Sequence, residues 1–401
     1  MTFSWPRAGL LYAALLAAAS AAPRIEWDAS TRKFACAGTY ARVKRLADGN
    51  LALVYSRGAN ACIRFGEGKG WGPETVVAAA PGYGYTNAEL AEVGNGRLIY
   101  AWNGRPNAAS AGKPWFIATK ASLDDGKTWS AESRAYTAGT VAGEGCWEPA
   151  LLALPDGSLQ VYFANEGPYP ANADQEIGML TSADAGRTWG GYRAISHRAG
   201  HRDGMPVPVF LGVGKGIAVA IEDNGIEGAF KPALLRTGPG GEWDRTVAGE
   251  DPRRSLAVMG AQRPSSAVYA GAPYLIRLRG GIRVLSCQST EGRTPAADPV
   301  THAVMQVYAA DAEGDFAART TPFPVPEGGQ GVWNSLAVLD DSTVMAVSSV
   351  RGMGSDGIWT VTGRVRGDAT SAIAIPARPV RADAIRALWR PDGRILPALR
   401  P

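Results

Sequence analysis

The stretch ALLALPDGSLQVYF, residues 150–163, reads as an apolar strand, a tight turn and a second apolar strand. Its central Asp156-Gly157 is a strong hairpin signal, because these residue types tolerate positive φ. The same pattern occurs six times, with starts 47, 61, 59, 65 and 61 residues apart. The other five copies are RVKRLADGNLALVY (42–55), ELAEVGNGRLIYAW (89–102), VFLGVGKGIAVAIE (209–222), YLIRLRGGIRVLSC (274–287) and SLAVLDDSTVMAVS (335–348).

A period of about 60 residues indicates an array of units that are each too small to bury their own apolar faces. If each hairpin is half of a four-stranded sheet, six such sheets form a six-bladed β-propeller. The composition agrees, since 50 glycines and 27 prolines favour short strands and tight turns over helices. The sequence therefore predicts an all-β fold, a six-bladed β-propeller, as a single domain over residues 22–401.

A second repeated motif, S-x-D-x-G-[KR]-T-W, occurs in SLDDGKTWS (122–130) and SADAGRTWG (182–190). Each copy falls where the third strand of a repeat turns into the fourth. Asp124 and Asp184 are expected to accept hydrogen bonds from turn amides, and Trp129 and Trp189 to pack between blades. Because weaker copies at 64–71 and 236–243 keep only a glycine and the tryptophan, we interpret the motif as a structural turn.

The first 21 residues have the pattern of a secretory signal peptide. Arg7 precedes an apolar stretch over 9–19, and small residues near Ala21 offer a cleavage site. The stretch is too short to span a membrane. We therefore expect an exported protein, secreted or periplasmic, that is not membrane-bound and is a monomer.

The charge and cysteine patterns exclude several function classes. A formal net charge of +4 without a basic block gives no indication of nucleic-acid binding. The four cysteines show no C-x-x-C spacing, which argues against a zinc site, and no other metal or cofactor is expected. Export would permit one or two disulfides, and the sequence leaves their pairing open. These cysteines are Cys36, Cys62, Cys146 and Cys287.

The repeated turn in a six-bladed propeller resembles the Asp-box, or BNR repeat, of the sialidase superfamily. Finer features resemble the exo-arabinanases of glycoside hydrolase family 93. These are YARVKRLADG (40–49), CWEPALLALPDGSLQVYF (146–163), RDGMPVPVF (202–210), AIEDNG (220–225), GAPYLIRL (271–278) and VWNSLAVLDD (332–341). The resemblance implies a retaining exo-glycosidase that releases a short oligosaccharide from linear α-1,5-L-arabinan, or from a related plant or microbial polysaccharide, without a cofactor.

Residues that flank the two strands of each hairpin are expected to gather at one mouth of the central channel. Acids, amides, arginines and aromatic residues around one concavity suit a carbohydrate. The residues placed there are Arg42, Arg57, Asn87, Glu89, Asn103, Glu148, Glu166, Arg202, Asp203, Glu222, Asp223, Tyr274, Gln288, Trp333 and Asn334.

Two glutamates are the candidates for catalysis. A retaining glycosidase needs two carboxyl groups about 5–5.5 Å apart. The resemblance maps the family's pair onto Glu148, expected as acid/base, and Glu222, expected as nucleophile. Glu166 on a site loop and Glu176 on a third strand are rivals, and a lone glutamate at a strand end more often caps a turn or pairs with an arginine.

Seven further residues are predicted to bind the substrate. Trp147, Tyr274 and Trp333 are expected to supply apolar platforms for sugar faces. Arg42, Asn87, Asp203 and Asn334 are expected to supply hydrogen bonds to hydroxyls. Two of these have open alternatives, since Asp203 could be a turn former and Arg42 could bind a strand-end carbonyl.

Three other functions compete with this one. A sialidase needs a tyrosine nucleophile assisted by a glutamate, plus three arginines for the substrate carboxylate. Arg42 and Arg57 could supply two, but Trp333 and Ser349 stand where the tyrosine and a glutamate are expected. A non-catalytic sugar-binding propeller needs no carboxylate pair. A lyase would need a base, for which His201 is the candidate.

The C-terminal segment RADAIRALWRPDGRILPALRP (381–401) lies outside the six repeats. It either closes the last blade together with a strand near RIEWD (24–28) or packs outside the propeller.

Overall fold

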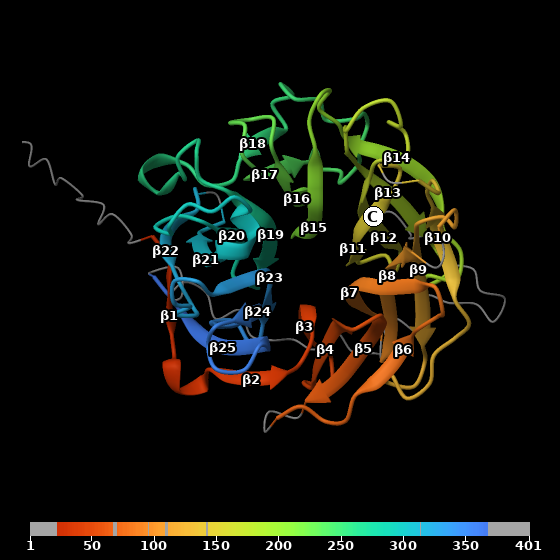
Figure 1. Ribbon diagram of the computed structural model, residues 1–401, viewed down its shortest axis with the longest axis horizontal. Helices are drawn as coiled ribbons and strands as arrows, with labels where there is room; N and C mark the ends of the chain where they lie inside the picture. The colour runs from red at the N-terminus through yellow and green to blue at the C-terminus, as the bar shows by residue number, and fades with distance from the viewer. Residues whose placement is uncertain are drawn as a thin grey trace, which may run out of the picture. The chain divides into compact units, whose positions relative to one another are not determined.

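Each predicted hairpin forms the inner half of an antiparallel sheet in the computed structural model, which describes residues 22–367 except 67–69, 95, 109–110, 142 and 313. In these residues six sheets surround a central axis as the blades of a propeller (Figure 1). The first three blades contain β3(Thr39–Arg45), β4(Leu51–Arg57), β5(Asn60–Gly66) and β6(Thr75–Ala78); β7(Tyr83–Val93), β8(Arg97–Pro106), β9(Phe116–Ser122) and β10(Ser133–Thr137); and β11(Cys146–Ala153), β12(Leu159–Asn165), β13(Glu176–Ser182) and β14(Gly190–Ser196).

Blades 4 and 5 follow the same order from the axis outward. They contain β15(Asp203–Gly212), β16(Gly216–Asp223), β17(Lys231–Arg236) and β18(Arg254–Leu256); and β19(Ala270–Arg277), β20(Arg283–Ser289), β21(Val304–Ala310) and β22(Ala317–Thr320). Short 3-10 helices lie in the connections η1(Ala29–Thr31), η3(Gly260–Gln262) and η4(Pro299–His302). The predicted all-β, six-bladed fold is confirmed.

Blade 6 joins the two ends of the described chain. It contains β23(Gln330–Val338), β24(Thr343–Arg351) and β25(Gly357–Arg366), and both β1(Arg24–Trp27) and β2(Lys33–Cys36) pair with β25. The red N-terminal strands therefore lie beside the blue β25 in Figure 1. A closing strand near RIEWD is confirmed, whereas the segment 381–401 and the predicted signal peptide lie outside the described residues.

The core lies within and between the blades. All seven residues of β12 are buried, because neighbouring blades cover both faces of its sheet. Tryptophan indoles also cross the blade boundaries. Trp189 Nε1 donates to Thr119 Oγ1 of blade 2 at 3.1 Å, and Trp243 Nε1 donates to the Tyr162 hydroxyl of blade 3 at 3.2 Å. The predicted packing of tryptophan between blades is confirmed for Trp189.

The two S-x-D-x-G-[KR]-T-W turns have the same hydrogen bonds. Asp124 Oδ1 accepts from the Thr128 N–H at 2.9 Å, and Ser122 Oγ accepts from the Gly126 N–H at 2.8 Å. The second turn repeats both bonds at 2.9 and 2.8 Å. Gly126 has φ +82, a conformation that disfavours a side chain. The predicted role of the aspartates in holding turn amides is confirmed.

The four cysteines are buried free thiols, and none of them forms a disulfide. In the described part of the chain, no helix is long and apolar enough to cross a membrane. The same residues contain no group of three or more histidine, cysteine, aspartate or glutamate side chains positioned to hold a metal ion.

Candidate active site

A β-bulge interrupts the innermost strand of every blade at the same place. In β3, for example, Tyr40 and Ala41 together face the single residue Tyr55, because the register shifts between Thr39 and Arg42. The first bulge residue of each strand has a positive φ of 45–58°. We call these six residues the bulge ring: Tyr40, Asn87, Glu148, Met205, Ala272 and Trp333.

The bulge ring turns side chains toward the channel axis, as bulges near functional sites commonly do. Tyr40 of blade 1 reaches Met205 of blade 4, with its hydroxyl 3.9 Å from the sulfur. Trp333 packs against Tyr40 with ring centroids 6.0 Å apart. A positive φ at a non-glycine residue costs about 1–3 kcal/mol and is concentrated at functional sites. The ring therefore marks the mouth of the channel as the candidate site.

Side chains of neighbouring blades hold the backbone of the ring. Ser349 Oγ accepts from the Tyr40 N–H at 3.0 Å, and Gln288 Oε1 accepts from the Trp333 N–H at 2.8 Å. Glu222 occupies the equivalent position in blade 4, and its Oε2 accepts from the Ala272 N–H at 2.7 Å. Three of the six blades thus supply a hydrogen-bond acceptor at this position, and only blade 4 of these three supplies a carboxyl group.

Both predicted catalytic glutamates contact one dipeptide of blade 4. Glu148 Oε2 accepts from the Met205 N–H at 3.2 Å. Glu222 lies opposite Gly204 in the sheet, and a Cβ on Gly204 would meet Glu222 Oε1 at 3.0 Å. The structure therefore brings Glu148 and Glu222 together at the mouth, both half-buried.

Burial and nearby charges raise the pKa values of the two carboxyl groups to different extents. Burial, with the nearby charge of Glu148, raises the pKa of Glu222 to about 8. Burial also raises the pKa of Glu148, but Arg105, the Met205 amide and Arg202 oppose it. Glu148 therefore has the better stabilised negative charge, and Glu222 is the better proton donor near neutral pH.

Two arginines flank the pair. Arg105 donates from Nε to Asn103 Oδ1 at 2.7 Å and from Nη2 to the bulge-ring residue Asn87, and its guanidinium lies 4.7 Å over the Trp147 ring. Arg202 donates to Glu166 and to Gln175. Both guanidinium groups are thus held by neighbouring side chains, while their charge acts on Glu148.

Glu166 and Glu176, the alternative candidates for the catalytic acids, make hydrogen bonds and ion pairs with other side chains. Glu166 pairs with Arg202 and accepts from the Gly145 N–H at 3.3 Å. Glu176, the first residue of the third strand β13, accepts from the hydroxyls of Tyr169 and Tyr192. Tyr169 in turn stacks on His197, with ring centroids 4.5 Å apart. These contacts fix the loop between β12 and β13 beside the mouth.

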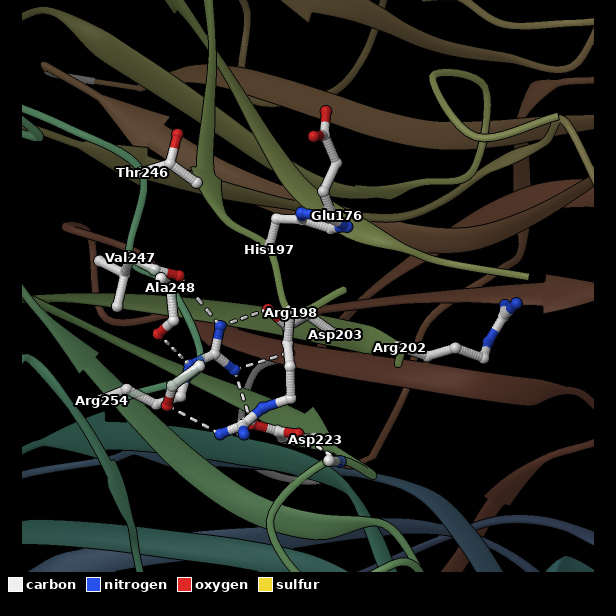
Figure 2. Close-up of polar contacts among 12 residues, drawn as sticks. Glu176, His197, Arg198, Arg202, Asp203, Asp223, Thr246, Val247, Ala248 and Arg254 are labelled. Carbon is white, nitrogen blue, oxygen red and sulfur yellow. Dashed lines mark hydrogen bonds and ion pairs between the residues drawn. The ribbon is translucent and has the colours of Figure 1, made fainter. Parts of the chain in front are cut away.

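Asp203 is not positioned to bind substrate. It has no exposed surface, and both carboxylate oxygens accept from Arg254 at 2.7 Å. Arg254 also donates to Asp223 at 2.6 Å, so that one guanidinium joins the facing ends of β15 and β16 (Figure 2). The predicted hydrogen bond from a sugar hydroxyl to Asp203 is corrected, because Arg254, distant in sequence, occupies both carboxylate oxygens.

The predicted substrate-binding roles of Arg42 and Tyr274 are also corrected. The Arg42 guanidinium is buried between the rings of Tyr40 (4.1 Å) and Tyr274 (4.9 Å) and donates to the carbonyls of Ala41, Trp333 and Asn334. This matches the alternative that Arg42 binds a strand-end carbonyl.

Tyr274 is 2% exposed and its hydroxyl accepts from Lys44 Nζ at 3.0 Å. It lines a channel cavity of about 320 Å³ together with residues of all six inner strands, including Glu89, which forms an ion pair with Lys44 at 2.9 Å. Tyr274 therefore lies inside the channel with its ring covered by Arg42, and is not an open platform.

The remaining predicted binding residues lie in or beside the bulge ring. Asn87 is buried and its amide oxygen accepts from Arg105, so it orients that arginine. Trp147 and Trp333 are partly exposed, although Arg105 covers one face of Trp147. Asn334 is buried, and both polar atoms of its side chain lack a hydrogen-bond partner in the described part of the protein. Direct binding by Trp147, Trp333 and Asn334 stays a prediction.

Sequence reasoning missed Arg105, Tyr40 and Met205 as members of the mouth. One signal was present, because five ring residues stand two positions before a predicted hairpin start. Met205 departs from that offset, and Arg105 follows the end of its predicted hairpin, at 102, by three residues. Arg57, in contrast, was placed at the mouth but is half-exposed and pairs with Glu74 at 3.1 Å.

Comparison with known proteins establishes the fold. No family model and no curated protein matches the chain. A protein of unknown function from Dyadobacter fermentans matches with a TM-score of 0.62 at 14% identity, covering 86% of this chain and 99% of the other. The GH93 α-L-arabinofuranosidase of Fusarium graminearum, solved with arabinobiose, matches with a TM-score of 0.61 at 17% identity, covering 86% and 98%.

An α-L-arabinanase of Penicillium chrysogenum complexed with arabinobiose matches with a TM-score of 0.59 at 19% identity, again covering 86% and 98%. Sialidases match with TM-scores of 0.51 and 0.52. The expected likeness to sialidase-type propellers, and to family 93 in particular, is thereby confirmed for the fold.

Proposed function

We propose that the protein is a retaining, exo-acting glycoside hydrolase that cleaves linear α-1,5-L-arabinan. The observation that carries this proposal is the pair Glu148 and Glu222, which lie against one dipeptide at the channel mouth and differ in how strongly their surroundings favour the proton. A retaining glycosidase requires one ionised and one protonated carboxyl group.

The electrostatics favour the opposite order of roles from the one expected from the sequence. In the first step Glu222 gives its proton to the glycosidic oxygen while the Glu148 carboxylate attacks the anomeric carbon, so that the leaving sugar departs and a glycosyl ester forms. In the second step Glu222 takes a proton from a water molecule, which attacks the anomeric carbon and releases Glu148. No cofactor takes part.

Two observations support a neutral sugar over a sialoside. Arg42 and Arg57, the two arginines that could have begun a carboxylate-binding triad, lie apart, one buried in the channel and the other paired with Glu74. At the mouth, Arg105 and Arg202 already bond to Asn87, Asn103, Glu166 and Gln175. The choice of arabinan rests on the family resemblance and on the arabinobiose that occupies the two named neighbours.

Product analysis on linear arabinan tests this function. The wild type is expected to release arabinobiose. Glu222→Gln should release it about 10²–10⁴-fold more slowly, and Glu148→Gln should release none, although both variants fold. Glu242→Gln, at an exposed position, is the matched control and should behave as the wild type. Release of sialic acid from a sialyl substrate, or silence on arabinan, would refute the proposed substrate.

We also propose that residues 1–21 direct export and that the mature protein is a monomer. Amino-terminal sequencing of the protein from the periplasm or medium should begin near residue 22, and light scattering should give the monomer mass. A protein that retains residues 1–21 in the cytoplasm would contradict the first proposal.

A further inference from the structure

A cleft of about 480 Å³ opens on blades 4 and 5. Its walls are the loop between β16 and β17, the segment before β19 and the loop after β20. The lining is mainly apolar with a few polar groups, as is common in clefts that bind small molecules. Its most prominent lining residues are Asn224, Phe230, Tyr269, Thr290, Pro295 and Pro299.

Tyr269 connects this cleft to Glu222. A Cβ on Gly271 would meet both the Tyr269 hydroxyl and Glu222 Oε2 at 2.6 Å, so the two groups lie over the same glycine. The Tyr269 hydroxyl accepts from Gln288 Nε2 at 2.8 Å. The same glutamine accepts from the N–H of Trp333 in the bulge ring. The inner end of the cleft is therefore the Glu222 side of the candidate active site.

Aromatic residues of the cleft and of the bulge ring pack against the same buried cluster. Phe230 and Trp333 both pack against the buried cluster of Tyr269, Ala303 and Val332. The Phe230 and Tyr269 rings are perpendicular, with centroids 6.5 Å apart. Packing contacts thus link Trp333 of the bulge ring to Phe230 in the cleft through one buried cluster.

Buried cations hold the walls in place. Lys231 is 1% exposed and donates to the carbonyls of Ser266 and Val268 at 3.1 and 2.7 Å, which ties the start of β17 to the segment before β19. Arg293 donates to the carbonyls of His302, Val325, Pro326 and Gly329 at 2.8–3.1 Å. Because the walls are fixed before a ligand arrives, binding in the cleft does not have to order them.

We propose that this cleft binds the leaving-group side of the substrate, that is, the neutral sugar residues beyond the scissile bond. The inference rests on the proposed function, in which Glu222 protonates the glycosidic oxygen. An acid that protonates this oxygen lies on the side of the departing sugar, and Tyr269 places the cleft on that side. Phe230 supplies a ring for the C–H face of a sugar.

The polar groups of the cleft suit hydroxyls and not a charged sugar. Thr290 Oγ1 accepts from the Tyr269 N–H at 3.2 Å, which leaves its own proton for a sugar oxygen. The one charged lining residue, among those described, is Arg293, and its donors are directed to backbone carbonyls.

The test compares two substrates that share the donor sugars but differ in the leaving group. One is α-1,5-linked arabinotetraose and the other is an aryl arabinobioside. Phe230→Ala is expected to reduce kcat/KM for the tetraose about ten-fold more than for the aryl substrate, because only the tetraose fills the cleft with sugar. Phe34→Ala removes another partly exposed phenylalanine, 41% exposed on the outer strand β2, and should leave both values unchanged.

Phe230→Leu, which keeps the apolar bulk but loses the flat ring, covers the case in which the alanine variant does not fold, and should show the same selective loss. Equal changes on both substrates, or none, in an active enzyme would overturn the cleft assignment and leave the proposed function standing. A wild type that cleaves neither substrate would refute the proposed function, and the inference that rests on it would fail as well.

Discussion

The carboxylate of Glu222 in blade 4 accepts a hydrogen bond from the backbone N–H of Ala272 in blade 5 at 2.7 Å. Gln288 and Ser349 make the equivalent bond at the next two blade boundaries with neutral groups. A neutral acceptor would therefore satisfy the fold at this position. The buried carboxyl group of Glu222 lowers the stability of the protein, although the fold does not require it. A catalytic role at the mouth would explain its presence.

The first prediction concerns stability. Because the pKa of Glu222 is raised to about 8, the folded protein retains a proton that the unfolded chain releases above about pH 4.3. The stability that this proton contributes is complete below that pH and is lost as the pH rises toward 8. Glu222→Gln keeps an acceptor for the Ala272 N–H, so at pH 8 it should unfold several degrees above the wild type.

Thermal unfolding at pH 5 and pH 8 measures this difference, which should shrink at the lower pH. Glu242→Gln, at an exposed site, should follow the wild type at both values. A melting temperature of Glu222→Gln that never exceeds that of the wild type would show that the buried carboxyl group does not lower the stability of the folded protein.

The second prediction concerns the pH profile of hydrolysis. The protonated form of Glu222 is the active acid, so kcat/KM should fall as the pH rises through about 8. The charge of Glu148 contributes to that high pKa, and Glu148→Gln should lower it. Carbon-13 NMR titration of the glutamate carboxyl groups in the two proteins checks the coupling, and an unchanged titration of Glu222 would contradict it.

The third prediction separates the roles of the two glutamates. Glu222→Gln should lower kcat on arabinan about 10²–10⁴-fold. The loss should be much smaller on an aryl glycoside whose leaving group needs no proton. Glu148→Gln should lose activity on both substrates, because no nucleophile remains. If the two variants exchange these patterns, the order of roles expected from the sequence is the correct one.

The fourth prediction concerns Asp203. Asp203→Ala leaves part of a fully buried arginine without its partner and should cost about 3 kcal/mol in the free energy of unfolding. Urea unfolding measures this cost. Asp244, which is exposed and pairs with Arg253, provides the control, because Asp244→Ala should cost under about 1 kcal/mol. A stable Asp203→Ala variant with a raised KM would restore the role predicted from the sequence.

The fifth prediction contrasts two aromatic residues that the sequence placed together. Trp333→Ala should raise KM for arabino-oligosaccharides about ten-fold, since Trp333 is partly exposed in the bulge ring. Tyr274→Phe removes a hydroxyl that accepts from Lys44 inside the channel and should leave KM unchanged. Initial-rate kinetics on both variants measure these KM values. A raised KM for Tyr274→Phe would place the substrate deeper in the channel.

The sequence predicted the architecture because its signals are local and repeated. Each turn and its two apolar runs specify a hairpin within 14 residues, three of the turns being Asp-Gly or Asn-Gly, and six hairpins at similar spacing lead to the propeller. The two aspartate turns are equally local, since Asp124 bonds to Thr128 only four residues away. Glu148 and Glu222 became candidates because each flanks a hairpin strand and because the family resemblance maps a catalytic pair onto them.

Only the tertiary structure decided which polar residues face the mouth. Asp203 and Glu222 both flank hairpin strands of blade 4, yet Arg254 from β18 takes the first into a buried ion pair, while the second lies beside Glu148. A bulge in each inner strand determines where the ring side chains point, and their partners come from other blades. Hairpins are encoded by neighbouring residues, whereas burial, side-chain direction and pKa depend on residues that meet only when six sheets close around one axis.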